Sequence, residues 1–100
     1  MNGRITKRPH EKFDIDFDFA RDIPDGDSLP ASSSASSVTV TPSGLTLSSS
    51  PAREHSGTIV KQWIEAGTDE EDYRVVCRAT TTDGRVFELV MVVEVRDDTA

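Results

Sequence analysis

The sequence contains few of the residues on which chemistry at a protein site usually depends. Of its 100 residues, one is cysteine, two are histidine and 6% are aromatic. A lone cysteine, Cys77, excludes an internal disulfide and a cysteine-based metal site, and on a strand we expect it to be a small buried apolar residue. No apolar run is long enough to span a membrane, and residues 1–12 lack the hydrophobic segment of a signal peptide. We therefore expect no membrane partner, and a protein made in the cytoplasm or assembled there into something larger.

Catalytic motifs are also lacking. His10 lies in an expected tail and His55 in an expected loop, and no motif surrounds either of them. The many serines form no Gly-x-Ser-x-Gly elbow, and the glycines form no phosphate-binding loop. Low complexity, most evident in residues 28–37, explains the serines better than nucleophilic catalysis does. We expect no enzyme, no catalytic residue and no cofactor.

The net charge of −7 is distributed unevenly along the chain. Residues 1–12 hold four basic residues and one acidic residue, a balance of +3, which leaves −10 for residues 13–100. This acidic body argues against nucleic acid as a partner, because a phosphate backbone requires a basic surface. We expect residues 1–12 to be a flexible basic arm. The arm is either a solvated terminus or a contact that reaches a neighbouring subunit through Arg4, Lys7 and Arg8.

Residues 13–19 alternate without exception between apolar and acidic side chains. A period of two predicts a half-buried strand, because on a helix the same apolar residues would be scattered around the axis. The acidic face consists of Asp14, Asp16 and Asp18. Clustered aspartates can supply the oxygen ligands of calcium, but the EF-hand spacing fails because Phe19 stands where glycine is required. A solvated edge strand that resists aggregation explains the same pattern, so calcium is an alternative and no metal ligand is assigned.

Residues 73–96 have the pattern of a β-hairpin. Residues 73–80 alternate strictly, Asp83-Gly84 follows, and residues 85–96 continue with almost no breakers. Asp-Gly between two such runs predicts a two-residue type I′ turn, because that turn needs a positive φ at both central residues. The apolar faces of this hairpin and of residues 13–19 give the expected core: Phe13, Ile15, Phe17, Phe19, Tyr73, Val75, Leu89, Met91 and Val93.

The opposite face of the hairpin carries three outward valines, Val76, Val90 and Val92. An outward apolar cluster lowers solubility unless something covers it. Ordinary β-propensity on an exposed face is one explanation. A protein–protein interface is the other, and we favour it because Val76 stands on the same side as the two valines of the paired strand.

Shorter strands are expected at residues 38–41, 45–47 and 58–64, and no segment has a helical period. In residues 58–64 two phases remain open, with either Ile59, Lys61 and Trp63 or Val60, Gln62 and Ile64 in the core. Six or seven short strands separated by turn residues predict an all-β, antiparallel β-sandwich over residues 13–96, with residues 97–100 frayed. Gly67 followed by Tyr73 at the start of the penultimate strand fits the tyrosine corner of immunoglobulin-like domains.

The order and spacing of several motifs are similar to those of small structural proteins of tailed bacteriophages and prophages. Residues 7–19, KRPHEKFDIDFDF, resemble their K-x-P-x-E-x-L-D-Y-x-I-D-W opening, although Phe19 stands where tryptophan is usual. A loop with Gly26-Asp27 follows. Further along come the matching segments VTPSGL (residues 40–45), QWI (62–64), Gly67-Thr68 before Tyr73, TTDGR (81–85) and VEVR (93–96). The acidic residues 69–72 lengthen the loop before Tyr73 relative to this pattern.

The resemblance covers residues 7–96 and implies an immunoglobulin-like virion component from the head–tail gene region. Such proteins are decoration, collar, neck or head–tail junction parts without catalytic residues. The implied partners are capsid, neck or tail subunits, with the chain forming a homo-oligomer in the particle after assembly in the host cytoplasm. An alternative is a module that binds host-surface glycans, with Trp63 and Tyr73 as stacking platforms. The low aromatic content argues against a sugar site.

Overall fold

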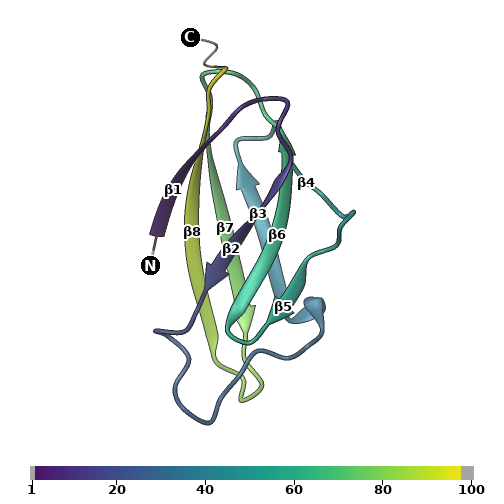
Figure 1. Cartoon of the computed structure of the whole chain (residues 1–100). Coiled ribbons are helices and arrows are strands. Elements are labelled where there is room, and N and C mark those ends of the chain that lie inside the picture. The colour runs from purple at the N-terminus through teal and green to yellow at the C-terminus, as the bar shows by residue number, and fades with distance from the viewer. Residues whose placement is uncertain (1, 98–100) are drawn as a thin grey trace.

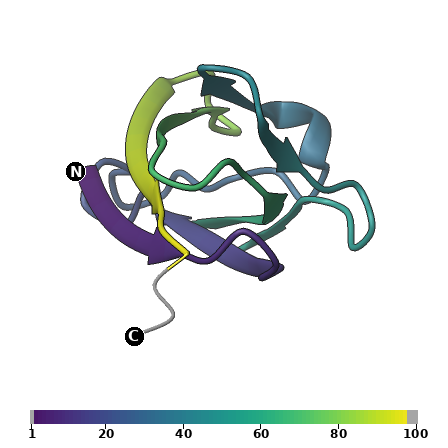
Figure 2. The ribbon, with the colours of Figure 1, turned by 90° about the horizontal axis from the view of Figure 1, so that it is seen from above.

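Two β-sheets pack face to face, and Figure 1 shows how the chain passes back and forth between them. A computed structural model describes residues 2–97, without the side chain of Asn2. The first sheet has the order β1 (Asn2–Lys7), β8 (Val86–Val95), β7 (Asp72–Thr80) and β3 (Ser36–Thr41). The second has the order β2 (Phe13–Asp18), β6 (Ile59–Ala66) and β4 (Leu45–Leu47), and β5 (Glu54–Ser56) also pairs with β6. A 3-10 helix, η1 (Ser33–Ala35), precedes β3. The expected all-β sandwich is confirmed, and Figure 2 shows its two curved layers from above.

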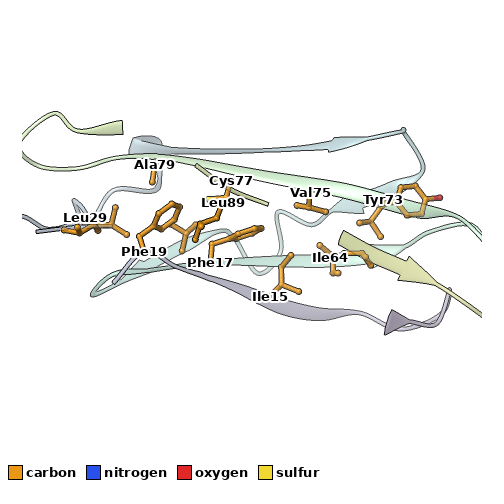
Figure 3. Packing of buried hydrophobic residues seen from close by; sticks show 14 of the residues in the cluster. Ile15, Phe17, Phe19, Leu29, Ile64, Tyr73, Val75, Cys77, Ala79 and Leu89 are labelled. Carbon is orange, nitrogen blue, oxygen red and sulfur yellow. The ribbon is translucent and has the colours of Figure 1, made fainter. Parts of the chain in front are cut away.

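The core lies between the sheets and is built from the alternating positions of β2, β6, β7 and β8. Figure 3 shows these side chains in a row between the layers, with Tyr73 at one end and Leu29 at the other. Seven of the nine residues expected in the core are at most 5% exposed, while Phe13 and Met91 are partly buried and pack against the others. Full burial of one such side chain contributes about 1.5–3 kcal/mol. The period-two pattern therefore predicts most of the side chains that form the core.

Residues 2–7 form a strand, which corrects the flexible arm expected for residues 1–12. β1 runs parallel to β8, from Asn2 opposite Val90 to Lys7 opposite Val95. Ile5 packs against the core, but one apolar residue is too few to reveal an alternation in the sequence. At the other end of the chain, the N–H of Asp97 donates to Asp69 Oδ1 at 2.7 Å. Met1 and residues 98–100, which belong to the expected arm and frayed end, lie outside the described residues.

The end of β1 is held by a buried lysine. Lys7 is 0% exposed, and its Nζ donates to the carbonyl oxygens of Arg8 at 2.8 Å and Ala66 at 2.5 Å. Burial lowers the pKa of Lys7, and the nearby carboxylates of Glu11 and Glu65 oppose that shift. The contact joins the end of β1 to the end of β6, where Ala66 has a φ of 63°. Lys7 is therefore a structural residue.

The structure settles the phase of β6. Val60, Gln62 and Ile64 face the core, and Lys61 and Trp63 are half-buried on the outer face. A glutamine is acceptable inside because its Nε2 donates to the carbonyl oxygens of Ser48 at 3.1 Å and Trp63 at 2.8 Å.

The turn between β7 and β8 is longer than the two residues predicted. The N–H of Thr81 donates to Arg85 O at 2.7 Å, and the N–H of Gly84 donates to Thr81 O at 3.0 Å, so residues 82–84 lie inside the turn. Gly84 has a φ of 93°, whereas Asp83 has no positive φ. One positive φ instead of two is the geometry of a type I turn followed by a left-handed glycine. The Asp-Gly dipeptide thus marks the position of the turn, but its type I′ assignment is wrong.

Asp27 connects the long loop after β2 to this turn. Its Oδ1 accepts hydrogen bonds from the N–H groups of Ser28 at 2.8 Å and Asp83 at 3.1 Å, and its Oδ2 accepts one from Arg85 Nη1 at 2.9 Å. Burial alone would raise the pKa of Asp27, but hydrogen bonds from Thr81, Arg85 and the backbone outweigh it and lower the pKa to about 2. The charged carboxylate therefore holds the two segments together.

Tyr73 closes one end of the core at the start of β7. The residue is 1% exposed, and its hydroxyl oxygen accepts a hydrogen bond from the N–H of Thr68 at 2.9 Å. A Cβ at Gly44 would lie 2.8 Å from the same hydroxyl oxygen, so the approach of this loop requires glycine. Tyr73 therefore positions both the loop before β7 and the loop before β4.

We predict that Tyr73→Phe lowers the free energy of unfolding by about 1–2 kcal/mol, because the ring stays in place while the Thr68 N–H loses its partner. Urea unfolding of the two proteins measures the difference. Ser43→Ala removes an exposed hydroxyl from the adjacent loop and should change stability by less than about 0.5 kcal/mol. Equal stability of Tyr73→Phe and the parent chain would contradict the role given to this hydroxyl.

We also predict that Asp27 makes stability fall as the pH is lowered from 3.8 to about 2. In this window the unfolded chain takes up the Asp27 proton while the folded chain does not, so acid favours unfolding; above it the stabilisation is fully present. Urea unfolding across the window should show a smaller fall for Asp27→Asn than for the parent chain. Asp25→Asn, an exposed neighbour in the same loop, is the matched control. An equal effect of both substitutions would show that the Asp27 contacts are not the source.

Candidate functional site

The three outward valines lie together on the outer face of the β1-β8-β7-β3 sheet. Val76 on β7 is directly opposite Val90 on β8, and Val92 is the next outward residue along β8. All three are half-buried. We call Val76, Val90 and Val92 the valine patch. The pairing of β7 with β8 brings these three side chains together on one face, as the alternation in the hairpin predicts.

Two ion pairs flank the valine patch. Arg78 on β7 binds Glu88 on β8 with Nη2 and Oε2 3.0 Å apart, and Arg4 on β1 pairs with Glu94 on β8. Arg4 also lies opposite Val92 in the register, which puts it at the border of the patch. Apolar residues inside a charged border, with arginine prominent, have the composition typical of a protein–protein interface.

Of the three basic residues predicted to reach a neighbour, only Arg4 lies beside the valine patch. The buried ammonium of Lys7 is not available at the surface. Arg8 is exposed, and its N–H donates to Glu11 Oε1 at 2.7 Å in the turn that follows β1. Of the predicted interface, Arg4 lies with the valines, whereas Lys7 ends β1 with a buried side chain and Arg8 lies in the connection to β2.

The aspartates of β2 do not converge on a common point. Asp14 pairs with Lys61 at 3.6 Å, and Asp18 Oδ1 accepts hydrogen bonds from the N–H of Ala20 and the hydroxyl of Thr58, both at 2.9 Å. Within residues 2–97 no group of three or more His, Cys, Asp or Glu could hold a metal ion.

The two aromatic residues considered for sugar stacking lie in different surroundings. Tyr73 is in the core with its hydroxyl occupied, so it cannot serve as a platform. Trp63 is half-buried on the outer face of β6, on the opposite sheet from the valine patch. Of the two aromatic residues considered as platforms, only Trp63 has part of its ring at the surface.

The remaining chemically interesting side chains have structural contacts. His55 on β5 binds Pro30 O through Nδ1 at 2.7 Å and Ser36 Oγ through Nε2 at 2.8 Å. Arg53 donates to Ser36 Oγ at 2.8 Å, so this cluster attaches β5 to the start of β3. Burial raises the pKa of the Cys77 thiol to about 12, which leaves it an unreactive core residue. No helix in the described part of the chain is long and apolar enough to cross a membrane.

Comparison with known proteins gives one family. Residues 7–94 match the family described as podophage GP4 fiber-tail adaptor protein gp77. A comparison with curated proteins found no match. The matched segment contains every strand except the first five residues of β1 and the end of β8, and it includes the valine patch and Asp27. The chain therefore belongs to the podophage GP4 fiber-tail adaptor protein gp77 family, and it is a structural phage protein of the virion.

Proposed function

We propose that this chain is an adaptor that joins tail and fiber subunits at the junction of a podophage-type virion, and that it docks through the valine patch. The family match carries this proposal. The valine patch with its border of ion pairs supplies the surface, on a body whose residues 13–100 carry a charge of −10. No chemical step is needed, because an adaptor acts by binding two partners at once.

The energetics of the patch suit an assembly that repeats around a symmetry axis. Full burial of a valine contributes about 1.5 kcal/mol or more, so three half-buried valines supply only a modest affinity per subunit. Several copies that bind together sum such contacts, because each later contact forms at a high effective concentration. We therefore propose that the chain acts as a homo-oligomer in the particle, arranged as a ring at the neck, collar or tail.

The sandwich itself is of the immunoglobulin type in this proposal. In immunoglobulin domains strand B neighbours E, strand C neighbours F, and F neighbours G. Here β2 pairs with β6, β3 with β7, and β7 with β8. The hydrogen bond from the Thr68 N–H to Tyr73, at the start of the strand that corresponds to F, has the form of a tyrosine corner. The parallel strand β1 supports the same arrangement as an addition beside the last strand.

We predict that Val76→Lys combined with Val92→Lys lowers the number of copies recovered in particles about tenfold or more, since two charges would be buried without partners, and about 1.4 kcal/mol already corresponds to a factor of ten. Quantitative mass spectrometry of purified particles measures the copy number. The double variant Val76→Thr and Val92→Thr keeps the side-chain shape and should give an intermediate loss.

Ile59→Lys is the matched control, because Ile59 is a partly buried β-branched residue on β6, in the other sheet. Circular dichroism first establishes that each variant is folded. Normal incorporation of the valine variants together with loss of Ile59→Lys would move the docking surface to the other sheet and refute the proposed one. Particles that lack fibers but keep the chain would place it on the tail side of the junction.

A further inference from the structure

The first residues of β8 form an open edge of the sheet. β8 pairs with β7 along residues 86–94, but its pairing with β1 begins only at Val90. Among the described residues, residues 86–89 therefore have a strand partner on one side only. Figure 1 shows β1 beginning beside the middle of β8, with the lower part of β8, which holds its first residues, extending below it.

The backbone of Glu88 points toward this open side. Val95 exchanges hydrogen bonds with the residues before β7, since its N–H donates to Glu71 O and its O accepts from the N–H of Glu70. Arg96, one position on, instead donates its N–H to Lys7 O, toward β1. Backbone groups alternate in direction along a strand, and the register of β8 is continuous from Val86 to Glu94. Glu88, an even number of residues from Arg96, therefore directs its N–H and C=O to the side that β1 leaves open.

An apolar groove lies beside this edge. It has a volume of about 130 Å³ and is lined by Gly3 at the start of β1, by Leu89, Val90 and Met91 on β8, and by residues 16–18 of β2. Gly3 leaves the groove open because it has no side chain, and an added Cβ would lie 3.1 Å from Met91 Sδ. Val86 belongs to the same segment and, at 56% exposed, is the most exposed large apolar side chain of the described residues.

The border of the groove is acidic. Asp16 and Asp18 are exposed and line it, and within residues 2–97 neither forms an ion pair. An apolar groove between carboxylates favours a segment that combines apolar and basic side chains. An open edge beside it supplies main-chain hydrogen bonds to an extended strand, which is the usual form of recognition at such edges.

We propose that residues 86–89 and the adjacent groove bind an extended segment of a partner virion protein, with alternating apolar and basic residues, that adds a strand in line with β1. The apolar side chains enter the groove opposite Phe87 and Leu89. The basic side chains alternate with them and lie on the outer face of the sheet, on the side of the Glu88 carboxylate, while Asp16 and Asp18 border the groove that the apolar side chains enter. This inference rests on the proposed adaptor function and assigns it a second contact, which adjoins the valine patch at Val90 but uses the backbone edge and the groove, so that one chain can hold two partners.

A peptide with this pattern is the probe: acetyl-Thr-Lys-Val-Lys-Val-Lys-Thr-amide, added to the purified chain. Amide hydrogen exchange followed by NMR should show that the Glu88 N–H exchanges about tenfold or more slowly with the peptide, because it gains an inter-strand partner. Asp16→Asn combined with Asp18→Asn should weaken binding about tenfold, since the two negative charges that border the groove are lost. The same peptide with glutamate in place of lysine should give no protection.

Gly3→Leu fills the groove and should abolish the protection. Val76→Lys combined with Val92→Lys should leave it unchanged, so that a failure of the docking surface and a failure of the strand addition are seen separately. No slowing at Glu88, or equal slowing with the glutamate peptide, would overturn the proposal. Light scattering of the chain alone tests whether a second copy occupies the edge. A dimer whose Glu88 N–H is protected only at high concentration would show that it does, and would also overturn the proposal.

Discussion

The rest of the structure depends on the register of β8 between its two neighbours. Its odd-numbered residues, such as Leu89 and Val93, enter the core, and its even-numbered residues carry the valine patch and its ion pairs. A shift of one residue would exchange these two sets, which would expose the core side chains and bury Glu88 and Glu94. Three contacts oppose such a shift: the turn closed by Gly84, the hydrogen bond from Arg96 to Lys7, and the hydrogen bonds of Val95 to the loop before β7. The register of β8 thus determines both which side chains form the core and which form the valine patch.

Where local pattern and tertiary environment agree, the sequence predicts the fold well. β2 and β7 alternate strictly in burial because one face of each meets the core and the other does not, and β8 keeps an unbroken apolar core face although its outer face also carries valines. The pattern fails for β1 and β5, which have too few apolar residues to show a period and form because a neighbouring strand offers its backbone. It is ambiguous for β6, where Gln62 occupies a core position and Trp63 an outer one. Only the carbonyl partners of Gln62, supplied by Ser48 and Trp63, decide the phase.

The candidate interface was predictable to the extent that it depends on pairing within the hairpin. Once Val76 and Val90 are placed opposite each other, the valine patch follows from the sequence. The role of Arg4 was predicted as that of a mobile arm, and its fixed position results from a parallel pairing that no local motif announces. Asp27 was noted only as part of a Gly-Asp motif. Its function depends on Asp83 and Arg85, more than fifty residues away, as the separations of 56 and 58 positions show.

The parallel arrangement of β1 and β8 has a mechanical consequence. Because the two strands run in the same direction, the start of β1 and the end of β8 lie at opposite ends of their shared ladder, which spans six paired positions. A pull on those two points loads the ladder in shear, so that its hydrogen bonds bear the tension together. In an antiparallel hairpin pulled at its open end, the hydrogen bonds would instead break in succession. The same tension also loads two hydrogen bonds at the end of the ladder, the one from Lys7 Nζ to Ala66 O and the one from the Arg96 N–H to Lys7 O. In the adaptor function that we propose, such a geometry would resist the drag of a fiber.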